Sequence, residues 1–238
     1  MEREGGAARG FGTLDETGSA RGLAAVLARL RAAEAAAGRP PGSVALVAVS
    51  KEQPCERVRA VLEAGHRLFG ENRVQEARSR WDGADGLRSR YAGVALHLVG
   101  PLQTNKARAA MALFDAIHSL DRPRLAETLA RLADERGSCP DLLVQVNTGR
   151  EPQKAGVAPE DAAGLVALVR RLGLPLRGLM AIPPDGADPR PHFRLLRSIA
   201  ETEGLPWLSM GMSGDFEAAV AEGATHVRVG SALFGARR

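Results

Sequence analysis

Short apolar segments alternate with helical segments eight times between residue 44 and the end of the chain, and no hairpin turn joins two apolar segments directly. Strands that alternate with helices in this way pair in parallel and are joined by right-handed crossovers. Eight such units in about 200 residues predict an α/β protein with a single (β/α)₈ TIM barrel, at the small end of that fold's size range. An open, doubly wound parallel sheet is the alternative. The predicted strands comprise residues 44–49, 67–70, 94–99, 114–119, 142–146, 176–181, 207–210 and 226–229.

The segments around these units define the domain organisation. An extra N-terminal helix is expected at 21–38, so that one barrel domain comprises residues 21–238. Residues 1–20 are glycine-rich and polar and lack the apolar core of a signal peptide, which predicts a disordered leader. The chain stops just after the eighth strand, so no second domain is expected. The predicted helices that follow the strands comprise residues 54–64, 72–81, 105–113, 122–136, 159–172, 190–203, 216–222 and a short one from 232 onward.

Composition and charge argue against several classes of function. The net charge is +4, but the arginines are interspersed with acidic residues, which favours a solvated surface over a nucleic-acid interface. The five histidines show no metal-ligand spacing, and Cys55 and Cys139 lie far apart. Two cysteines without a disulfide pattern, and no apolar stretch of ~20 residues, predict a cytoplasmic protein that does not enter a membrane. No exposed apolar stripe is evident, so a monomer is expected.

The imbalance between arginine and lysine points to amine chemistry. The chain has 29 arginines and only three lysines, Lys51, Lys106 and Lys154. Arginine supplies the same positive charge but does not lose its proton to act as an amine nucleophile. A chain this rich in arginine is expected to keep lysine where arginine fails chemically, although codon bias would also leave a few lysines by chance. All three lysines follow predicted strands, on the face where such barrels place their active sites.

The loops after strands seven and eight resemble each other in composition. The first is Gly211–Asp215 and the second begins with Gly230 and Ser231. Barrels often bind phosphate at these two loops, beside the N-terminus of a short helix. Ser213 and Ser231 are expected to be helix N-caps, and the glycines let the backbone approach a phosphate. Ordinary turn glycines and caps are the alternative to a phosphate site.

Lys51 and Arg228 are the two cations expected beside this phosphate site. Lys51 ends the first strand, which is adjacent to the eighth once the barrel closes. An amine beside a phosphate site suggests Schiff-base chemistry with a phosphorylated aldehyde, and simple charge neutralisation is the alternative. Arg228 alternates with two valines of strand eight and is expected to face inward, where it needs a partner. A ring nitrogen of a ligand and a structural ion pair remain equal alternatives for that partner.

Six motifs follow one another in order along the chain, at residues 47–51, 69–76, 97–106, 178–183, 209–213 and 228–235. Together these motifs resemble the pyridoxal phosphate homeostasis proteins, and the resemblance extends from about residue 21 to the end. It implies a single-domain barrel like the N-terminal domain of alanine racemase, in a protein that carries pyridoxal 5′-phosphate (PLP) or regulates its supply and is not an established enzyme. Amino acids and PLP-dependent apoenzymes are the implied partners.

The resemblance also implies a role for individual residues. PLP would be held as an internal aldimine on Lys51, with Asn72 near its pyridine ring and Arg228 facing the ring nitrogen. Four positions depart from the family pattern. Arg73 stands where tyrosine is common and Gly214 where aspartate is common, while Gln53 replaces a frequent second lysine and Gln153 a usual serine. The remaining implied cofactor-binding residues are Met210, which would line the site, and the phosphate-binding residues Ser213, Gly230 and Ser231.

Two catalytic alternatives accompany the carrier interpretation. The first is a PLP-dependent amino-acid racemase. An arginine at the ring nitrogen weakens the cofactor as an electron sink, and the only tyrosine, Tyr91, is expected at the opposite end of the barrel from the site. The second is a Schiff-base aldolase or sugar-phosphate isomerase without PLP. That reaction needs an acid/base near Lys51, and Glu71 is the one candidate that the predicted strands place nearby.

Overall fold

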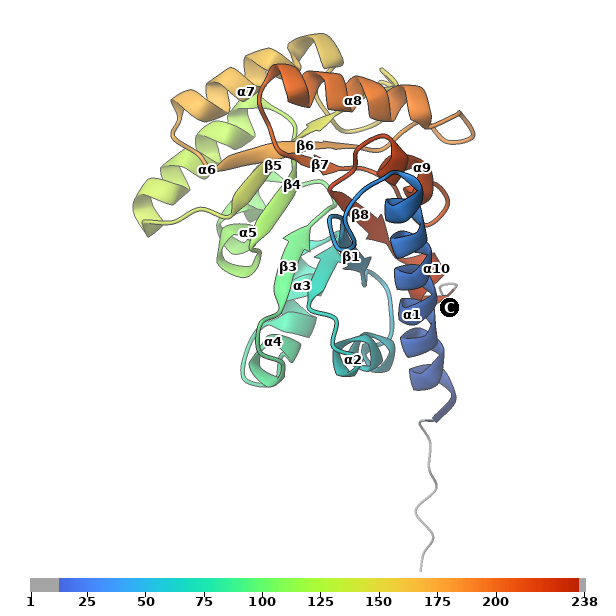
Figure 1. Ribbon diagram of the computed structural model, residues 1–238. Helices are drawn as coiled ribbons and strands as arrows, with labels where there is room; N and C mark the ends of the chain where they lie inside the picture. The colour runs from blue at the N-terminus through green and yellow to red at the C-terminus, as the bar shows by residue number, and fades with distance from the viewer. Residues whose placement is uncertain (1–12, 236–238) are drawn as a thin grey trace, which may run out of the picture.

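Eight parallel strands form a closed barrel in the computed structural model, which describes residues 13–235 (Figure 1). Each strand pairs with its neighbours in the order of the chain, and β1 and β8 close the barrel with Ala45 opposite His226. The predicted (β/α)₈ barrel is therefore confirmed, and the open sheet is excluded. The strands are β1 (Ala45–Val49), β2 (Leu68–Glu71), β3 (Ala95–Leu98), β4 (Ala116–Leu120), β5 (Asp141–Val146), β6 (Leu176–Ala181), β7 (Trp207–Ser209) and β8 (His226–Val229).

Helices surround this barrel at the positions that the sequence predicts, with one addition. The short helix α4 (Leu87–Arg90) lies between the predicted helix 72–81 and the predicted strand 94–99, where the sequence predicts no helix. Two of the predicted helices begin with a 3₁₀ turn, η1 (Thr104–Lys106) and η2 (Pro159–Asp161). The other helices are α1 (Thr13–Ala36), α2 (Cys55–Glu63), α3 (Val74–Trp81), α5 (Ala107–Leu113), α6 (Pro123–Arg136), α7 (Ala162–Arg171), α8 (Arg190–Thr202), α9 (Phe216–Ala221) and α10 (Ser231–Phe234).

Helix α1 begins at Thr13, eight residues earlier than the predicted N-terminal helix. Residues 13–20 are helical, and the rest of the predicted leader, residues 1–12, lies outside the described residues. Adding a residue to an existing helix costs far less than nucleating one, so a polar segment can extend a packed helix. The helix after β8, α10, has only four residues, and α1 lies beside it in the ring of helices (Figure 1). Gly22 allows this packing, because a Cβ there would lie 2.1 Å from the carbonyl oxygen of Leu233.

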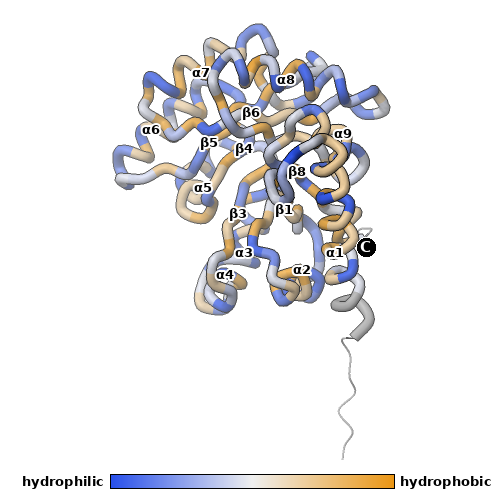
Figure 2. The backbone as a smooth tube through the Cα atoms, in the orientation of Figure 1, coloured by the Kyte–Doolittle hydropathy of each residue, from blue (hydrophilic) through white to orange (hydrophobic). Residues whose placement is uncertain are grey.

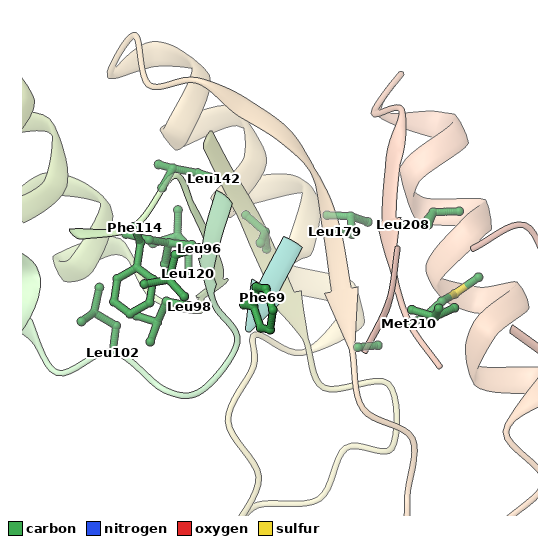
Figure 3. Close-up of a cluster of buried hydrophobic side chains, with 14 of the residues drawn as sticks. Phe69, Leu96, Leu98, Leu102, Phe114, Leu120, Leu142, Leu179, Leu208 and Met210 are labelled. Atoms are coloured by element: carbon green, nitrogen blue, oxygen red, sulfur yellow. The ribbon is translucent and has the colours of Figure 1, made fainter. Parts of the chain in front are cut away.

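The two faces of the strands bury different kinds of side chain. Between strands and helices lies a continuous apolar layer that includes Phe69, Leu98 and Leu179 (Figure 3). The helices alternate between hydrophobic and hydrophilic stretches, as expected when one face covers the strands (Figure 2). A second, small apolar cluster of Val47, Val49 and Val99 lies inside the barrel. No helix among residues 13–235 is long and apolar enough to cross a membrane.

Candidate functional site

A cavity of ≈ 340 Å³ opens at the carboxyl ends of the strands, where barrels of this kind place their active sites. Six of the seven residues predicted to bind a cofactor line it. The sequence did not predict the roles of Val49, Val99 and Ile182, which form apolar walls. The predicted residues in the lining are Lys51, Asn72, Ser213, Arg228, Gly230 and Ser231.

Met210 is the predicted site residue that the structure places elsewhere. Its side chain is fully buried in the apolar layer between the strands and the helices (Figure 3). Side chains alternate along a strand, and Ser209 already points into the barrel, so residue 210 points outward. Two residues later Met212 lines the cavity instead. The prediction that Met210 lines the site is therefore wrong.

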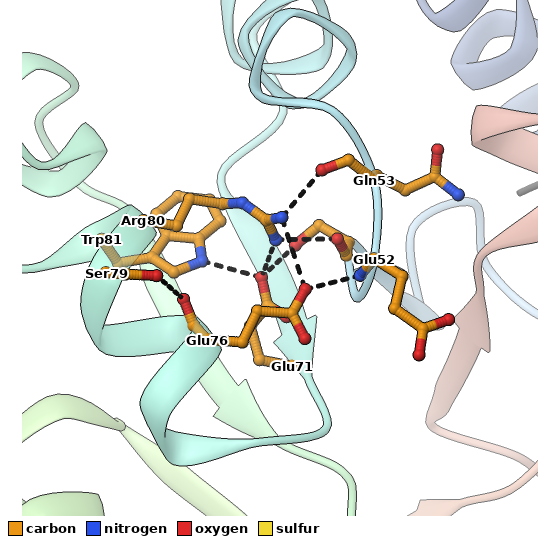
Figure 4. Close-up of polar contacts among 8 residues, drawn as sticks. Glu52, Gln53, Glu71, Glu76, Ser79, Arg80 and Trp81 are labelled. Carbon is orange, nitrogen blue, oxygen red and sulfur yellow. Dashed lines mark hydrogen bonds and ion pairs between the residues drawn. The ribbon is translucent and has the colours of Figure 1, made fainter. Parts of the chain in front are cut away.

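Lys51 reaches the cavity from the end of β1, and the backbone on both sides of it is held by helix α3. Arg80 donates hydrogen bonds to the carbonyl oxygens of Ser50 at 2.8 Å and of Gln53 at 2.8 Å (Figure 4). The backbone N–H of Glu52 donates to Oε1 of Glu76 at 2.5 Å. These contacts fix the segment 50–53, and we call Glu71, Glu76, Arg80 and Trp81 the outer brace.

Glu71 is the buried centre of the outer brace and lies outside the barrel. Its Oε1 accepts hydrogen bonds from Ser50 at 2.7 Å, Arg80 at 2.6 Å and Trp81 at 2.9 Å, while Oε2 has no partner (Figure 4). Burial raises the pKa of this carboxyl group, although Arg80 opposes that shift. The preceding Gly70 faces the valines inside the barrel, so Glu71 faces the helices and does not line the cavity. The acid/base candidate of the aldolase alternative is thus directed away from Lys51.

Ser213 connects the loops that follow β7 and β8. Its Oγ accepts hydrogen bonds from the backbone N–H groups of Gly230 and Ala232, each at 3.3 Å. The predicted N-cap roles of Ser213 and Ser231 are wrong, because α9 begins after Asp215 and Gly230 precedes α10. A serine that accepts two N–H groups keeps its own hydroxyl proton for another acceptor. Ser213 can therefore donate to an anion in the cavity.

Arg228 is held inside the barrel by neutral acceptors. It is 5% exposed, and it donates to Oγ of Ser209 at 2.8 Å and to the carbonyl oxygen of Ala181 at 2.9 Å. Among the described residues no carboxylate forms a salt bridge with Arg228. The structural ion pair, one of the two alternatives left by the sequence, is therefore not formed with any of these residues. Burial lowers the pKa of Arg228 to about 10.

A row of buried polar side chains continues from Arg228 through the interior of the barrel. Ser209 Oγ lies 2.8 Å from Nδ1 of His118, and Nε2 of His118 lies 3.0 Å from Nδ1 of His97. We call Arg228, Ser209, His118 and His97 the inner chain. Burial lowers the pKa of His97 to about 4 and that of His118 well below its usual value. This chain was not predicted from the sequence, although polar residues within otherwise apolar strands are a signal that indicates it.

The other two lysines do not line this cavity. Lys154 forms a salt bridge with Glu151 at 2.8 Å and donates to the carbonyl oxygen of Pro183. Lys106 lies in an adjoining cleft of ≈ 700 Å³ that Asn72 also lines. Within residues 13–235, no cluster of histidine, cysteine and acidic side chains has the arrangement of a metal site.

Comparisons with known proteins identify the family of the chain. Residues 22–238 match the model of the family described as alanine racemase, N-terminal domain. The pyridoxal phosphate homeostasis protein of Pseudomonas aeruginosa is 44% identical over 229 residues, which cover 92% of this chain and 95% of that protein. PipY from Synechococcus elongatus PCC7942 has been solved without PLP, at 40% identity and a TM-score of 0.79 over 91% of this chain and 99% of that one. The PLP-bound structure of PipY matches at 39% identity and a TM-score of 0.75, covering 91% of this chain and 100% of that chain. The chain therefore belongs to the family of pyridoxal phosphate homeostasis proteins.

Proposed function

We propose that the chain binds PLP in the cavity at the mouth of the barrel and serves PLP homeostasis as a carrier. The observation that supports this most is the lining of the cavity, where Lys51 is the only lysine and Ser213 and Arg228 offer donors around it. Lys51 would hold the cofactor through a Schiff base, in which its Nζ condenses with the aldehyde carbon of PLP and one water leaves. The family to which the chain belongs supports the same function.

The residues of the cavity fit the size and charge of PLP. A volume of ≈ 340 Å³ lies within the usual range for small-molecule sites, and the lining includes two cations and no carboxylate. Ser213, Gly230 and Ser231 would hold the phosphate group. Asn72 would lie beside the pyridine ring, and Arg228 would donate to its ring nitrogen. When bound, PLP supplies an electrophilic carbon that reacts with amines, and the protein supplies the position and charge around it.

The same lining favours a carrier over an enzyme. Among the described residues that line the cavity there is no aspartate, glutamate, histidine, tyrosine or cysteine. Tyr91, which directly follows α4, donates to Glu63 at the end of α2 and is absent from this lining. A racemase needs a second group that exchanges a proton with its substrate. With Lys51 as the single amine, we infer that the protein holds and releases PLP and does not turn over amino acids at enzymatic rates.

The setting of the protein follows from the same proposal. Cys55 and Cys139 are both free thiols, which supports a reducing cytoplasm. Amino acids and PLP-dependent apoenzymes would be its exchange partners, because both present primary amines to the aldehyde of PLP. A monomer remains a prediction of the sequence.

Absorption spectroscopy with mapping of the attached lysine tests the proposal. Protein incubated with PLP is expected to show a visible band, and borohydride reduction should fix the cofactor to the peptide that contains Lys51. Lys51→Ala should lose both signals, whereas Lys106→Ala, which leaves the cavity lining intact, should keep them. Attachment at another lysine, or a protein that stays colourless, would contradict PLP binding at Lys51. Racemisation of an L-amino acid at roughly 1–10³ per second would contradict the carrier role.

A further inference from the structure

We propose that Ser209 and His118 are positioning residues that hold the Arg228 guanidinium at the cavity through a hydrogen-bond chain with a fixed direction. The chain runs from Arg228 to Ser209, then to His118 and finally to His97. Its direction concerns the protein without any ligand. Its effect on a bound cofactor rests on the proposed function.

The chain crosses the barrel and does not follow the sheet. Arg228 and Ser209 belong to the adjacent strands β8 and β7, and His118 and His97 belong to the adjacent strands β4 and β3. Strands β7 and β4 are not neighbours, so the bond of 2.8 Å between Ser209 and His118 spans the interior. Ser209 and His118 are both fully buried, which keeps bulk solvent away from the hydrogen bond between them.

The direction of the chain follows from what each group can donate. A guanidinium has N–H donors only, so Arg228 donates and Ser209 accepts. Apart from Arg228, His118 is the only partner of the Ser209 hydroxyl within the described residues. If His118 donated to Ser209, the buried hydroxyl proton would have no acceptor, and a buried donor without an acceptor destabilises the folded state. Ser209 therefore donates to Nδ1 of His118.

The same reasoning fixes the tautomers of two histidines. Since Nδ1 of His118 accepts from Ser209, its proton is on Nε2, which then donates to Nδ1 of His97 at 3.0 Å. His97 in turn carries its proton on Nε2. Both rings stay neutral in this arrangement, so the chain adds no positive charge beside Arg228.

Holding Arg228 in this way determines what it offers to a ligand. A guanidinium has five N–H groups, and the contacts with Ser209 and Ala181 use one on each terminal nitrogen. The remaining N–H groups of Arg228 can only meet an acceptor, because the guanidinium stays charged near neutral pH. The chain thus selects an unprotonated ring nitrogen over a protonated one at this point of the cavity.

Nuclear magnetic resonance of ¹⁵N-histidine-labelled protein tests the direction without any cofactor. The correlation pattern between ring nitrogens and carbon-bound protons should show the Nε2–H tautomer for both His118 and His97. His66 provides an internal reference, because its Nε2 lies 2.8 Å from the carbonyl oxygen of Leu68, which can only accept. An Nδ1–H tautomer at His118 would overturn the proposed direction.

Three variants test the positioning role. Ser209→Ala should weaken PLP binding about tenfold, the loss expected for one hydrogen bond, and should remove the donor signature at Nδ1 of His118. Ser209→Thr keeps a hydroxyl and should restore both. Ser119→Ala is the matched control, because this buried hydroxyl follows His118 and has no hydrogen-bond partner. Unchanged PLP affinity in Ser209→Ala would overturn the positioning role, whereas a wild-type protein that binds no PLP would overturn the proposed function and leave the tautomer test intact.

Discussion

The two cations that line the cavity are held by opposite means. Around Lys51 the outer brace uses ionised groups, because Arg80 bridges two backbone carbonyls and two carboxylates (Figure 4). Arg228 contacts the backbone carbonyl of Ala181 and the Ser209 hydroxyl, and the inner chain continues from that hydroxyl through neutral imidazoles. The brace fixes a stretch of backbone from outside the barrel, and the chain fixes a side chain from inside it.

Solvent access explains this difference. The Arg80 side chain is 11% exposed and Glu76 is 25% exposed, so water still reaches part of the brace and lowers the cost of its charges. The inner chain lies beneath the cavity, where His118 is fully buried. A carboxylate there would have to leave water completely, and a neutral dipole satisfies Arg228 at a smaller cost. Charged groups near the helices can therefore have charged partners, whereas the charged Arg228 inside the barrel has neutral partners.

The largest expected effect is the loss of stability on acidification, which comes from the barrel interior. Burial lowers the pKa values of His97 and His226 to about 4 from 6.5. Between pH 6.5 and about 4 the unfolded state binds a proton at each of these positions and the folded state does not. Unfolding then becomes easier as the pH falls, by about 1.4 kcal/mol per pH unit for each histidine. Urea unfolding at pH 7, 6 and 5 measures this slope.

Two variants separate the contribution of the buried histidines to this pH dependence of stability from that of the carboxylates. His226→Gln should reduce the slope by about 1.4 kcal/mol per pH unit, because one proton fewer is taken up on unfolding. The outer brace acts in the opposite sense, since the raised pKa of Glu71 makes the folded state bind a proton more readily than the unfolded state. Glu71→Gln should therefore steepen the loss of stability with acid. Equal slopes in wild type and His226→Gln would show that the interior histidine is not kept neutral.

The second effect comes from breaking the outer brace. Arg80→Met removes the cation that faces the buried Glu71, and we expect a loss of about 3–5 kcal/mol in the free energy of unfolding. The backbone carbonyl oxygens of Ser50 and Gln53 also lose the Arg80 N–H groups that donate to them. The segment 50–53 is then held less firmly, so PLP should bind more weakly at Lys51. Denaturant unfolding and a PLP titration measure the two losses.

An exposed arginine of the same helix supplies the control. Arg78 contacts Asp82 at 3.4 Å, and its side chain is 70% exposed. Arg78→Met should change stability by less than about 0.5 kcal/mol and leave PLP binding unchanged. Equal losses in Arg78→Met and Arg80→Met would mean that the brace contributes nothing beyond helix propensity.

The sequence predicted the cavity better than the networks that support it. The strand pattern and the lysine count located Lys51, and the alternation within β8 turned Arg228 inward, as the structure confirms. These inferences depend on local periodicity and on the closure of the barrel. The prediction that Met210 lines the site rested on the resemblance alone. Alternation along the predicted strand 207–210 turns its side chain outward, opposite to that of Ser209.

The supporting networks depend on distances that no local pattern contains. The bond between Ser209 and His118 joins residues 91 positions apart on strands that are not neighbours. Its existence depends on the stagger of eight strands around the barrel, which only closure determines. Similarly, the three donors at Glu71 meet because the end of β1 and helix α3 both lie beside β2 on the outside of the barrel.

The smallest effect compares a hydroxyl that donates to the outer brace with a hydroxyl that contacts neither network. Ser50 is fully buried and donates to the carboxylate of Glu71 at 2.7 Å, so Ser50→Ala should cost about 1.5–3 kcal/mol. Ser119 is equally buried but its hydroxyl has no partner, so Ser119→Ala should leave stability unchanged or slightly raised. Denaturant unfolding of both variants at pH 7 measures the difference. A similar loss in both would mean that filling space, and not the bond to Glu71, is what Ser50 contributes beside Lys51.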